Sequence, residues 1–218
     1  MSSHHIGRGD QEPALIIANG EACSMELLNQ LLEWNPLVIV LDSAITRVLE
    51  LGIKVDVLIG DFDRNFDYEY YKNLQYPIEI VKLNEQDSYD IDKAINYLID
   101  RKIPAANIVW ATGKRMDHTF TNITNLVKYQ EVIKLVMIDD YSKIFPLQKN
   151  FIKWYPKETI LSLIPVGIVE GISTKNLKYE LKNDSLVLGF KPGSSNEVLT
   201  DGLVEISYKN GYLILMGC

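Results

Sequence analysis

The segment Val55-Asp56-Val57-Leu58-Ile59-Gly60-Asp61-Phe62-Asp63-Arg64 decides the fold that this sequence encodes. Its first five residues form a mostly apolar, β-branched run, which predicts a buried strand of a parallel sheet. Two carboxylates follow directly, at Asp61 and Asp63. Neighbouring carboxylates repel unless a cation lies between them, and Mg²⁺, which accompanies nucleotide phosphates, is the expected cation. Phosphoryl chemistry is therefore the first functional hypothesis, and an ordinary turn that opens with Asp is the alternative.

Outward from this segment, short apolar runs alternate with stretches of helical periodicity, which is typical of a parallel α/β sheet. The expected strands are Ala14–Ala18, Leu37–Leu41, Val55–Ile59, Ile78–Leu83, Ile108–Ala111 and Val132–Ile138. The expected helices are Ser24–Trp34 with Ser24 as N-cap, Ala44–Leu51, one after the acidic segment 85–90 to about Arg101, and one after 112–118 through Tyr129. We expect residues 12–145 to form a Rossmann-like α/β domain.

After about Lys143 the helical periodicity gives way to short alternating runs separated by Gly, Pro and Asn. The expected strands are Thr159–Pro165, Leu177–Leu181, Leu186–Phe190, Leu203–Tyr208 and Tyr212–Met216. Between the last two, Asn210-Gly211 predicts a type I′ hairpin turn. We expect residues 146–218 to form an antiparallel β-sandwich domain.

Composition narrows the class of protein. The chain has 218 residues, a formal net charge of -7 and an isoelectric point near 5.0, which argues against a nucleic-acid-binding surface. Two cysteines at opposite ends of the sequence support neither a disulfide framework nor a zinc site. The polar N-terminus is no secretory signal, and no apolar run approaches the roughly 20 residues of a membrane-spanning helix. We therefore expect a cytoplasmic protein with no membrane partner.

Polar clusters follow several of the expected strands. In an open parallel sheet, ligands bind beyond the carboxyl ends of the strands, so loops from these ends converge on one edge. The residues in such loops are Asp42, Asp61, Asp63, Asp90, Lys114, Arg115, Asp117 and His118. Each has a structural alternative: Asp42 as a helix cap, Asp90 as an acid of a first helical turn, and the basic side chains as solvated groups.

The common nucleotide-binding motifs are missing from the sequence. It contains neither G-x-x-x-x-G-K-[ST] nor G-x-G-x-x-G, so a P-loop NTPase and a standard dinucleotide site lack support. Phosphate would have to be held by Mg²⁺ and by the Thr112–Arg115 loop, which precedes an expected helix.

These motifs together resemble the thiamine pyrophosphokinase (thiamine diphosphokinase) family over about residues 16–216. The matching blocks are Asp42-Ser43-Ala44 with Arg47, Ile59-Gly60-Asp61-Phe62-Asp63, Gln86-Asp87-Ser88-Tyr89-Asp90, Gly113-Lys114-Arg115-Met116-Asp117-His118 with Asn122, Ser162-Leu163-Ile164-Pro165, and Ser194-Ser195-Asn196-Glu197. Their order and spacing make the resemblance specific.

The resemblance implies a role for each matching side chain. Asp61, Asp63 and Asp90 would hold Mg²⁺ and through it the ATP phosphates, and Asp42 would join the same acidic pocket. On the nucleotide side it implies Lys114, Arg115, Asp117, His118 and Asn122. On the thiamine side it implies Gln86, Ser195 and Asn196, in a cleft completed across a homodimer.

The resemblance also implies the reaction. The hydroxyl of thiamine attacks the β-phosphorus of ATP and AMP leaves, so that positioning and electrostatics supply most of the rate. The chain departs from the family pattern at Ser43, Arg64 and Tyr89, where Gly, Ser and Thr are common. These departures affect the fit of the substrates more than the chemistry, because all three carboxylates are retained.

Three other functions remain open from the sequence. A 6-hydroxymethylpterin diphosphokinase would use the same cleavage of ATP on another alcohol. A haloacid-dehalogenase-like phosphatase would use Asp61 and Asp63 with Asp139-Asp140 as its downstream acidic pair, but would leave residues 86–90 and 113–118 without a role. A non-catalytic nucleotide sensor would keep the pocket and bind without turnover.

Overall fold

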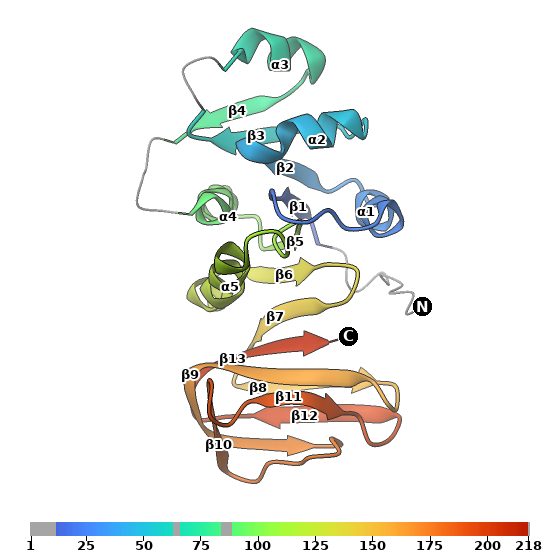
Figure 1. The fold of residues 1–218 in the computed structure, drawn as a ribbon, viewed down its shortest axis with the longest axis vertical. Helices are drawn as coiled ribbons and strands as arrows, with labels where there is room; N and C mark the ends of the chain where they lie inside the picture. Colours follow the sequence, from blue (N-terminus) through green and yellow to red (C-terminus); the bar gives the residue numbers. More distant parts are fainter. Residues whose placement is uncertain (1–11, 63–65, 84–88, 218) are drawn as a thin grey trace. The chain divides into compact units, whose positions relative to one another are not determined.

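A computed structural model describes residues 12–62, 66–83 and 89–217 of the chain. The chain divides into two compact units, each continuous in space but not in sequence (Figure 1). The first contains residues up to 122 together with 132–140, and the second contains residues 123–131 and 141 onward. The parallel α/β and antiparallel β classes predicted for the two halves are confirmed, while the domain boundary at residue 145 stays a prediction.

Parallel strands form the sheet of the first unit. They are β1 (Ala14–Ile17), β2 (Leu37–Leu41), β3 (Val57–Gly60), β4 (Glu79–Lys82), β5 (Ala105–Val109) and β6 (Lys134–Ile138). Their order in the sheet is β4-β3-β2-β1-β5-β6. The chain thus moves outward from β1 to β4 and then returns to add β5 on the other side of β1. Ligands of open α/β sheets bind where the strand order reverses in this way, which here is between β1 and β5.

Helices connect these strands. They are α1 (Met25–Leu32), the 3₁₀ helix η2 (Asp42–Ala44), α2 (Ile45–Glu50), α3 (Tyr68–Leu74), α4 (Asp90–Asp100), α5 (Met116–Asn125) and the 3₁₀ helix η3 (Leu126–Tyr129). The hydroxyl of Ser24 accepts a hydrogen bond from Leu27 N, so the predicted N-cap of α1 is confirmed. In the described part of the chain, no helix is long and apolar enough to cross a membrane.

Both faces of the parallel sheet are covered. Leu15, Val40 and Leu58 lie in one apolar cluster with Leu28 of α1 and Val48 of α2. Helix α4 packs against β2 and β3 and buries its own apolar residues. Burial on two faces explains why these strands read as continuous apolar runs and not as alternating ones.

The second unit is antiparallel. Its strands are β7 (Lys143–Leu147), β8 (Asn150–Tyr155), β9 (Ile160–Lys175), β10 (Asp184–Val187), β11 (Gly193–Glu197), β12 (Gly202–Ser207) and β13 (Asn210–Gly217). The long strand β9 pairs with β10, β11, β12 and β13. The apolar core of this unit includes Leu163, Ile172 and Leu213.

Two predictions for the second unit are wrong. Residues 177–181 form no strand. Leu177 makes only an isolated bridge to Val198, and the backbone N–H of Tyr179 donates to the side chain of Asn196 and not to a neighbouring strand. Asn210-Gly211 forms no hairpin turn, because it begins β13, which pairs with β7 and β9 and not with β12. A Cβ on Gly211 would lie 2.1 Å from Ile168 O, so glycine serves the close approach of two strands there. Strands β7, β8 and β11 were not predicted.

The first unit differs from expectation mainly at the ends of its elements. Helix α3 was not predicted; Asp67 caps it by accepting a hydrogen bond from Tyr70 N. Strand β5 ends at Val109, two residues earlier than expected. Trp110 and Ala111 therefore belong to the loop at the carboxyl edge, where they line a cavity. The helix expected to run through Tyr129 gives way to η3 after Asn125.

Candidate active site

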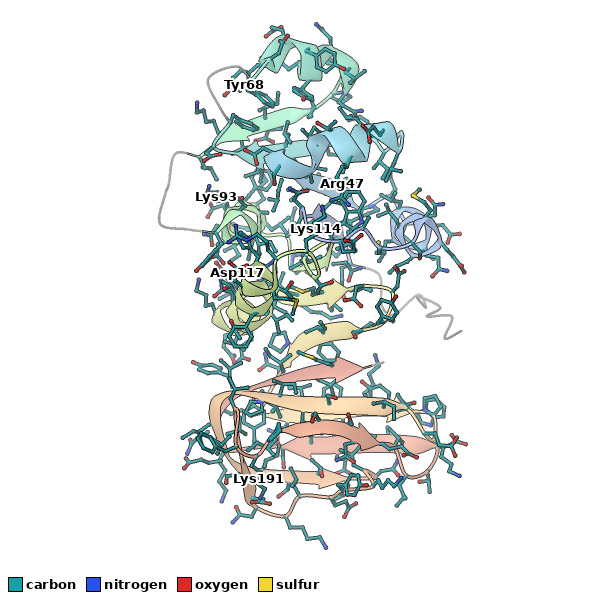
Figure 2. The ribbon with its side chains drawn as sticks, in the orientation of Figure 1. Arg47, Tyr68, Lys93, Lys114, Asp117 and Lys191 are labelled. Carbon is teal, nitrogen blue, oxygen red and sulfur yellow. The ribbon has the colours of Figure 1, made fainter. Side chains whose placement is uncertain are left out.

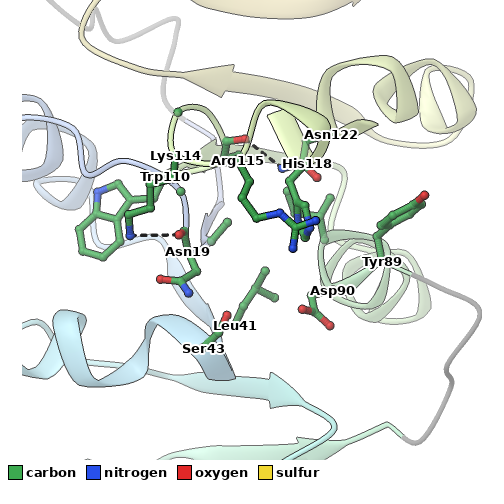
Figure 3. A pocket seen from close by; sticks show the side chains of 15 residues that line it. Asn19, Leu41, Ser43, Tyr89, Asp90, Trp110, Lys114, Arg115, His118 and Asn122 are labelled. Atoms are coloured by element: carbon green, nitrogen blue, oxygen red, sulfur yellow. Dashed lines mark hydrogen bonds between the residues drawn. The ribbon is translucent and has the colours of Figure 1, made fainter. Parts of the chain in front are cut away.

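A cavity of about 550 Å³ lies at the carboxyl edge of the parallel sheet, at the β1–β5 reversal. Its walls come from the loops that follow β1, β2 and β5, from the first turn of α4 and from the first two turns of α5 (Figure 3). Of the residues predicted for the site, the cavity is lined by Asp90, Lys114, Arg115, His118 and Asn122. Asp42, Asp61 and Asp117 do not line it. The predicted convergence of strand-end loops is thus present in the first unit.

Asp42 packs against the end of the neighbouring strand β3. Its Oδ2 accepts a hydrogen bond from Phe62 N at 3.3 Å. A Cβ added to Gly60 would come within 2.1 Å of the same oxygen, so glycine at the end of β3 is what allows this packing. The alternative role as a helix cap is not found, because the cap of α2 is Ala44 and no side chain bonds to it.

The environment of Asp42 disfavours its negative charge. Burial raises the pKa of Asp42 above its usual value, and the nearby charges of Asp90 and Asp61 raise it further. Asp42 therefore lies within electrostatic reach of carboxylates from two other loops. A cation near Asp42 would offset this repulsion, and the Mg²⁺ predicted from the spacing of Asp61 and Asp63 stays a prediction.

The backbone after β3 turns sharply at Phe62, which has a φ of 43°. This turn buries the Phe62 ring among Phe66, Tyr68 and Tyr71 and leaves Asp61 exposed. An aromatic cluster thus anchors the loop that carries the carboxylate. Asp63 and Arg64 lie outside the described residues.

Asp90 is the first residue of α4, and its carboxylate is 48% exposed. Its Oδ1 lies 3.1 Å from Nζ of Lys93, a lysine that is only 4% exposed (Figure 2). This buried cation was not predicted, although its i, i+3 spacing from Asp90 on an expected helix was a signal. Gln86 lies outside the described residues.

The acidic residues offer the oxygen ligands that Mg²⁺ prefers. Within residues 12–62, 66–83 and 89–217, no three acidic, His or Cys side chains lie close enough together to hold a metal ion by themselves. Mg²⁺ does not require such a cluster, because it retains several waters and commonly uses one or two carboxylates together with substrate phosphates. Asp90, which lines the cavity, and the exposed Asp61 offer carboxylates of this kind, so a Mg²⁺ site that also uses substrate phosphates stays a prediction.

The loop between β5 and α5 brings basic groups to the cavity. Arg115 forms a two-point ion pair with Asp117, at 3.1 Å from Nε to Oδ1 and 2.5 Å from Nη2 to Oδ2. This pair lowers the pKa of Asp117 to about 2 and raises that of Arg115, so both remain charged. Asn122 fixes the loop, because its amide donates to Ala111 O at 2.9 Å. His118 and Lys114 also line the cavity.

Ser195 and Asn196 belong to β11 of the second unit. Ser195 is exposed, has a φ of 56°, and donates its N–H to Oγ of Ser162 at 2.9 Å. Asn196 is buried, and its amide oxygen accepts from Tyr179 N and Glu197 N while its nitrogen donates to Tyr179 O. Their predicted contact with thiamine stays a prediction; as the structure has it, Asn196 holds the backbone on either side.

The acidic pair at the end of β6 has structural roles. Both oxygens of Asp140 accept from Ser24 N, at 3.0 and 2.8 Å, and Asp139 accepts from the hydroxyl of Thr112 at 2.9 Å. These bonds tie β6 to the start of α1 and to the β5–α5 loop. The phosphatase hypothesis, which needed this pair for catalysis, loses its main support.

Part of the cavity wall was not predicted from the sequence. Asn19 and Gly20, after β1, and Trp110, after β5, line the cavity, and Arg47 lies over the Trp110 ring. The Asn-Gly pair directly after the first expected strand was an available signal, since it occupies the same edge as the carboxylates.

Comparison with known proteins identifies relatives over nearly the whole chain. A model of the thiamin pyrophosphokinase catalytic domain matches residues 28–137, and a model of the vitamin B1 binding domain of the same family matches residues 149–213. Thiamine pyrophosphokinase from Bacillus subtilis (strain 168) is 27% identical over 92% of this chain and 96% of its own. Thiamine pyrophosphokinase 1 from Oryza sativa subsp. japonica is 31% identical over 69% of this chain and 61% of its own.

Solved structures share the fold. The crystal structure of yeast thiamin pyrophosphokinase superimposes with a TM-score of 0.81 at 20% identity, covering 98% of this chain and 87% of the yeast chain. That of the Bacillus subtilis enzyme gives 0.76 at 24% identity, covering 94% of this chain and 98% of the other. With both family models matched in order along the sequence, the chain belongs to the thiamine pyrophosphokinase family.

Proposed function

We propose that this protein is a thiamine diphosphokinase, which transfers the diphosphoryl group of ATP to the hydroxyl of thiamine and releases AMP. The observation that carries the proposal is the cavity at the β1–β5 reversal, where the carboxylate of Asp90 and the basic side chains of Lys114 and Arg115 come together from separate loops. Such an arrangement suits a metal-bound polyphosphate, because the acidic groups attract the cation and the basic groups attract the phosphates.

The residues of the chain divide the work as follows. Asp61 and Asp90, with Asp63, would hold Mg²⁺, and Asp42, which packs against the end of β3, would belong to the same acidic pocket. When bound, Mg²⁺ neutralises charge on the phosphates. Lys114 and Arg115 would bind the phosphates, while Asp117 fixes the Arg115 guanidinium through its two-point ion pair. His118 and Asn122 would shape the nucleotide side, the latter by fixing the loop at Ala111 O.

The thiamine side of the proposal involves Gln86, Ser195 and Asn196. The match to the vitamin B1 binding domain supports a thiamine-binding role for the second unit. The side chain of Asn196 forms hydrogen bonds with the backbone N–H and carbonyl of Tyr179. Part of its role in thiamine binding would therefore be to position the backbone at Tyr179.

We propose that the protein acts as a homodimer with the active site between subunits. The second unit exposes large apolar side chains on neighbouring strands: Ile152 and Trp154 of β8 are 64% and 57% exposed, and Leu203 of β12, opposite Trp154, is 56% exposed. Exposed apolar groups gathered on one surface are typical of protein interfaces. Sedimentation of the purified protein would show a dimer, and a monomer at all concentrations would contradict it.

A cytoplasmic location is part of the same proposal. Burial raises the pKa of the Cys23 thiol to about 11, so this thiol is unreactive, and among residues 12–62, 66–83 and 89–217 it forms no disulfide.

One assay tests the reaction. The protein is incubated with ATP, Mg²⁺ and thiamine, and AMP and thiamine diphosphate are measured. Formation of both in equal amounts is expected. Phosphate release without AMP would indicate a phosphatase. Nucleotide binding without either product would indicate a sensor, and turnover only with a 6-hydroxymethylpterin would indicate the related diphosphokinase.

A further inference from the structure

Arg47, which does not itself line the cavity, contacts residues that form one of its walls. Arg47 of α2 lies with its guanidinium carbon 4.5 Å from the centre of the Trp110 ring. The same guanidinium donates to Gly20 O at 2.9 Å and to Oδ1 of Asn19 at 3.2 Å. Arg47 therefore joins the loop after β1 to the loop after β5.

This contact fixes which way the Asn19 amide faces. A guanidinium can only donate hydrogen bonds, so the atom next to Arg47 must be the amide oxygen. The amide nitrogen then occupies the other position, in a residue that lines the cavity. In the part of the chain that the structure describes, this nitrogen donates to no protein acceptor, so it is available to a ligand.

Lys114 adds a second donor beside Asn19. Its Nζ bonds to the main-chain oxygen of Asn19 at 3.3 Å, as Figure 3 shows. Lys114 adopts a φ of 51°, a left-handed conformation that side chains other than Gly, Asn and Asp rarely occupy. The conformation places an ammonium group, with further donors to spare, at the same wall.

The two sides of the cavity thus differ in polarity. Asn19 and Lys114 present only donors on one side, and Asp90, which interacts with Asp42, lies on the other, acidic side, toward which Arg115 also projects (Figure 3). A divalent cation and the phosphates bound to it belong to the acidic side. An amide and an ammonium group suit a phosphate that the cation does not neutralise.

We propose that Asn19, with its amide oriented by Arg47, binds the phosphate of the nucleoside monophosphate leaving group together with Lys114. Asn19 is then a binding residue and Arg47 a positioning residue. The assignment rests on the proposed function for the identity of the nucleotide, but it concerns binding and can be tested without turnover.

The first test replaces the donor and leaves the shape unchanged. Asn19→Asp keeps an acceptor for Arg47 but removes the amide N–H groups and adds a negative charge. In calorimetry with EDTA, its affinity for AMP should fall by roughly tenfold or more, as expected for loss of a hydrogen bond to a charged group. Its affinity for adenosine, which has no phosphate, should be unchanged.

The second test separates positioning from stability, and the chain offers a matched control. Arg101 on α4 also lies over an aromatic ring, 4.4 Å from that of Tyr97, and bonds to Glu79, but it does not line or support the cavity. Arg47→Met and Arg101→Met should lower the melting temperature by similar amounts. Only Arg47→Met should weaken AMP binding, and Arg47→Lys should restore part of it.

The outcomes distinguish this inference from the proposed function. Unchanged AMP affinity in Asn19→Asp, equal loss of AMP and adenosine binding, or no AMP binding by the wild type at millimolar concentration would each overturn the assignment, even if thiamine diphosphate is formed. Selective loss of AMP binding would support it, even if thiamine is not the acceptor.

Discussion

The two units use polar side chains in different ways. In the first, the groups at the strand ends, such as Asp90, Lys114 and Arg115, line a cavity. In the second, the side-chain amides of Asn196 and Asn176 form hydrogen bonds with the backbone groups of Tyr179 and Thr200, respectively. Parallel strands all point their carboxyl ends to one edge, so their loops gather there. Antiparallel strands send loops to both ends, and polar side chains are needed to hold those loops.

The largest expected effect of this difference lies in the acidic group of the first unit. Asp61→Asn and Asp90→Asn should each lower turnover by about a hundredfold to a thousandfold, because charge stabilisation at the phosphates is lost. The far-ultraviolet circular dichroism should stay unchanged. Asp100→Asn, at the exposed end of the same helix as Asp90, is the matched control and should keep full activity. Near-wild-type turnover in either site variant would remove that residue from the metal site.

A second prediction concerns the packing behind the acidic group. In Gly60→Ala the new Cβ would meet Oδ2 of Asp42 at 2.1 Å, so Asp42 must move and its hydrogen bond from Phe62 N must break. We expect activity to fall by roughly tenfold or more, as for loss of a charged hydrogen bond in the site. A double variant that combines Asp42→Ala with Gly60→Ala should then lose no more activity than Asp42→Ala alone. Additive losses in the double variant would show that Gly60 acts independently of Asp42.

In the second unit the expected effect is on stability. Asn196→Ala removes the partners of three backbone groups, and should lower the free energy of unfolding by about 2 to 3 kcal/mol. Ser195→Ala, at an exposed neighbouring position, should change it by less than about 0.5 kcal/mol. Urea titration of both variants measures the difference. Equal stability of the two would contradict a structural role for the Asn196 amide.

The smallest effect concerns pH. The pKa of Asp42 is raised in the folded chain, so its protonation favours the folded state. That contribution is present below the pKa of the unfolded chain and is lost as the pH rises through the folded pKa. The side chain in Asp42→Asn has no proton to lose. The melting temperature of this variant minus that of the wild type should therefore be larger at pH 7 than at pH 3. A difference that is independent of pH would contradict the raised pKa.

Much of the first unit could be predicted because its signals are local. Strands buried on both faces leave apolar runs, and Ser24 marks the start of α1 by its side chain. The ends of elements were harder. Trp110 continues the apolar run of β5, so only the pairing of β5 with β1, which ends at Val109, shows that it belongs to the loop. The second unit was less predictable, because pairing between distant strands decides whether a short alternating run such as 177–181 becomes a strand.

The sequence by itself determined the class of each half, the carboxylates after β3 and the family to which the chain belongs, because these depend on residue types at fixed spacing. Only the tertiary structure decided that Asp42 packs against Gly60, that Lys93 is buried beside Asp90, and that Arg47 orients Asn19. Each of these contacts joins residues from different elements or depends on burial. Spacing along the chain carries no information about the atoms that folding brings into contact.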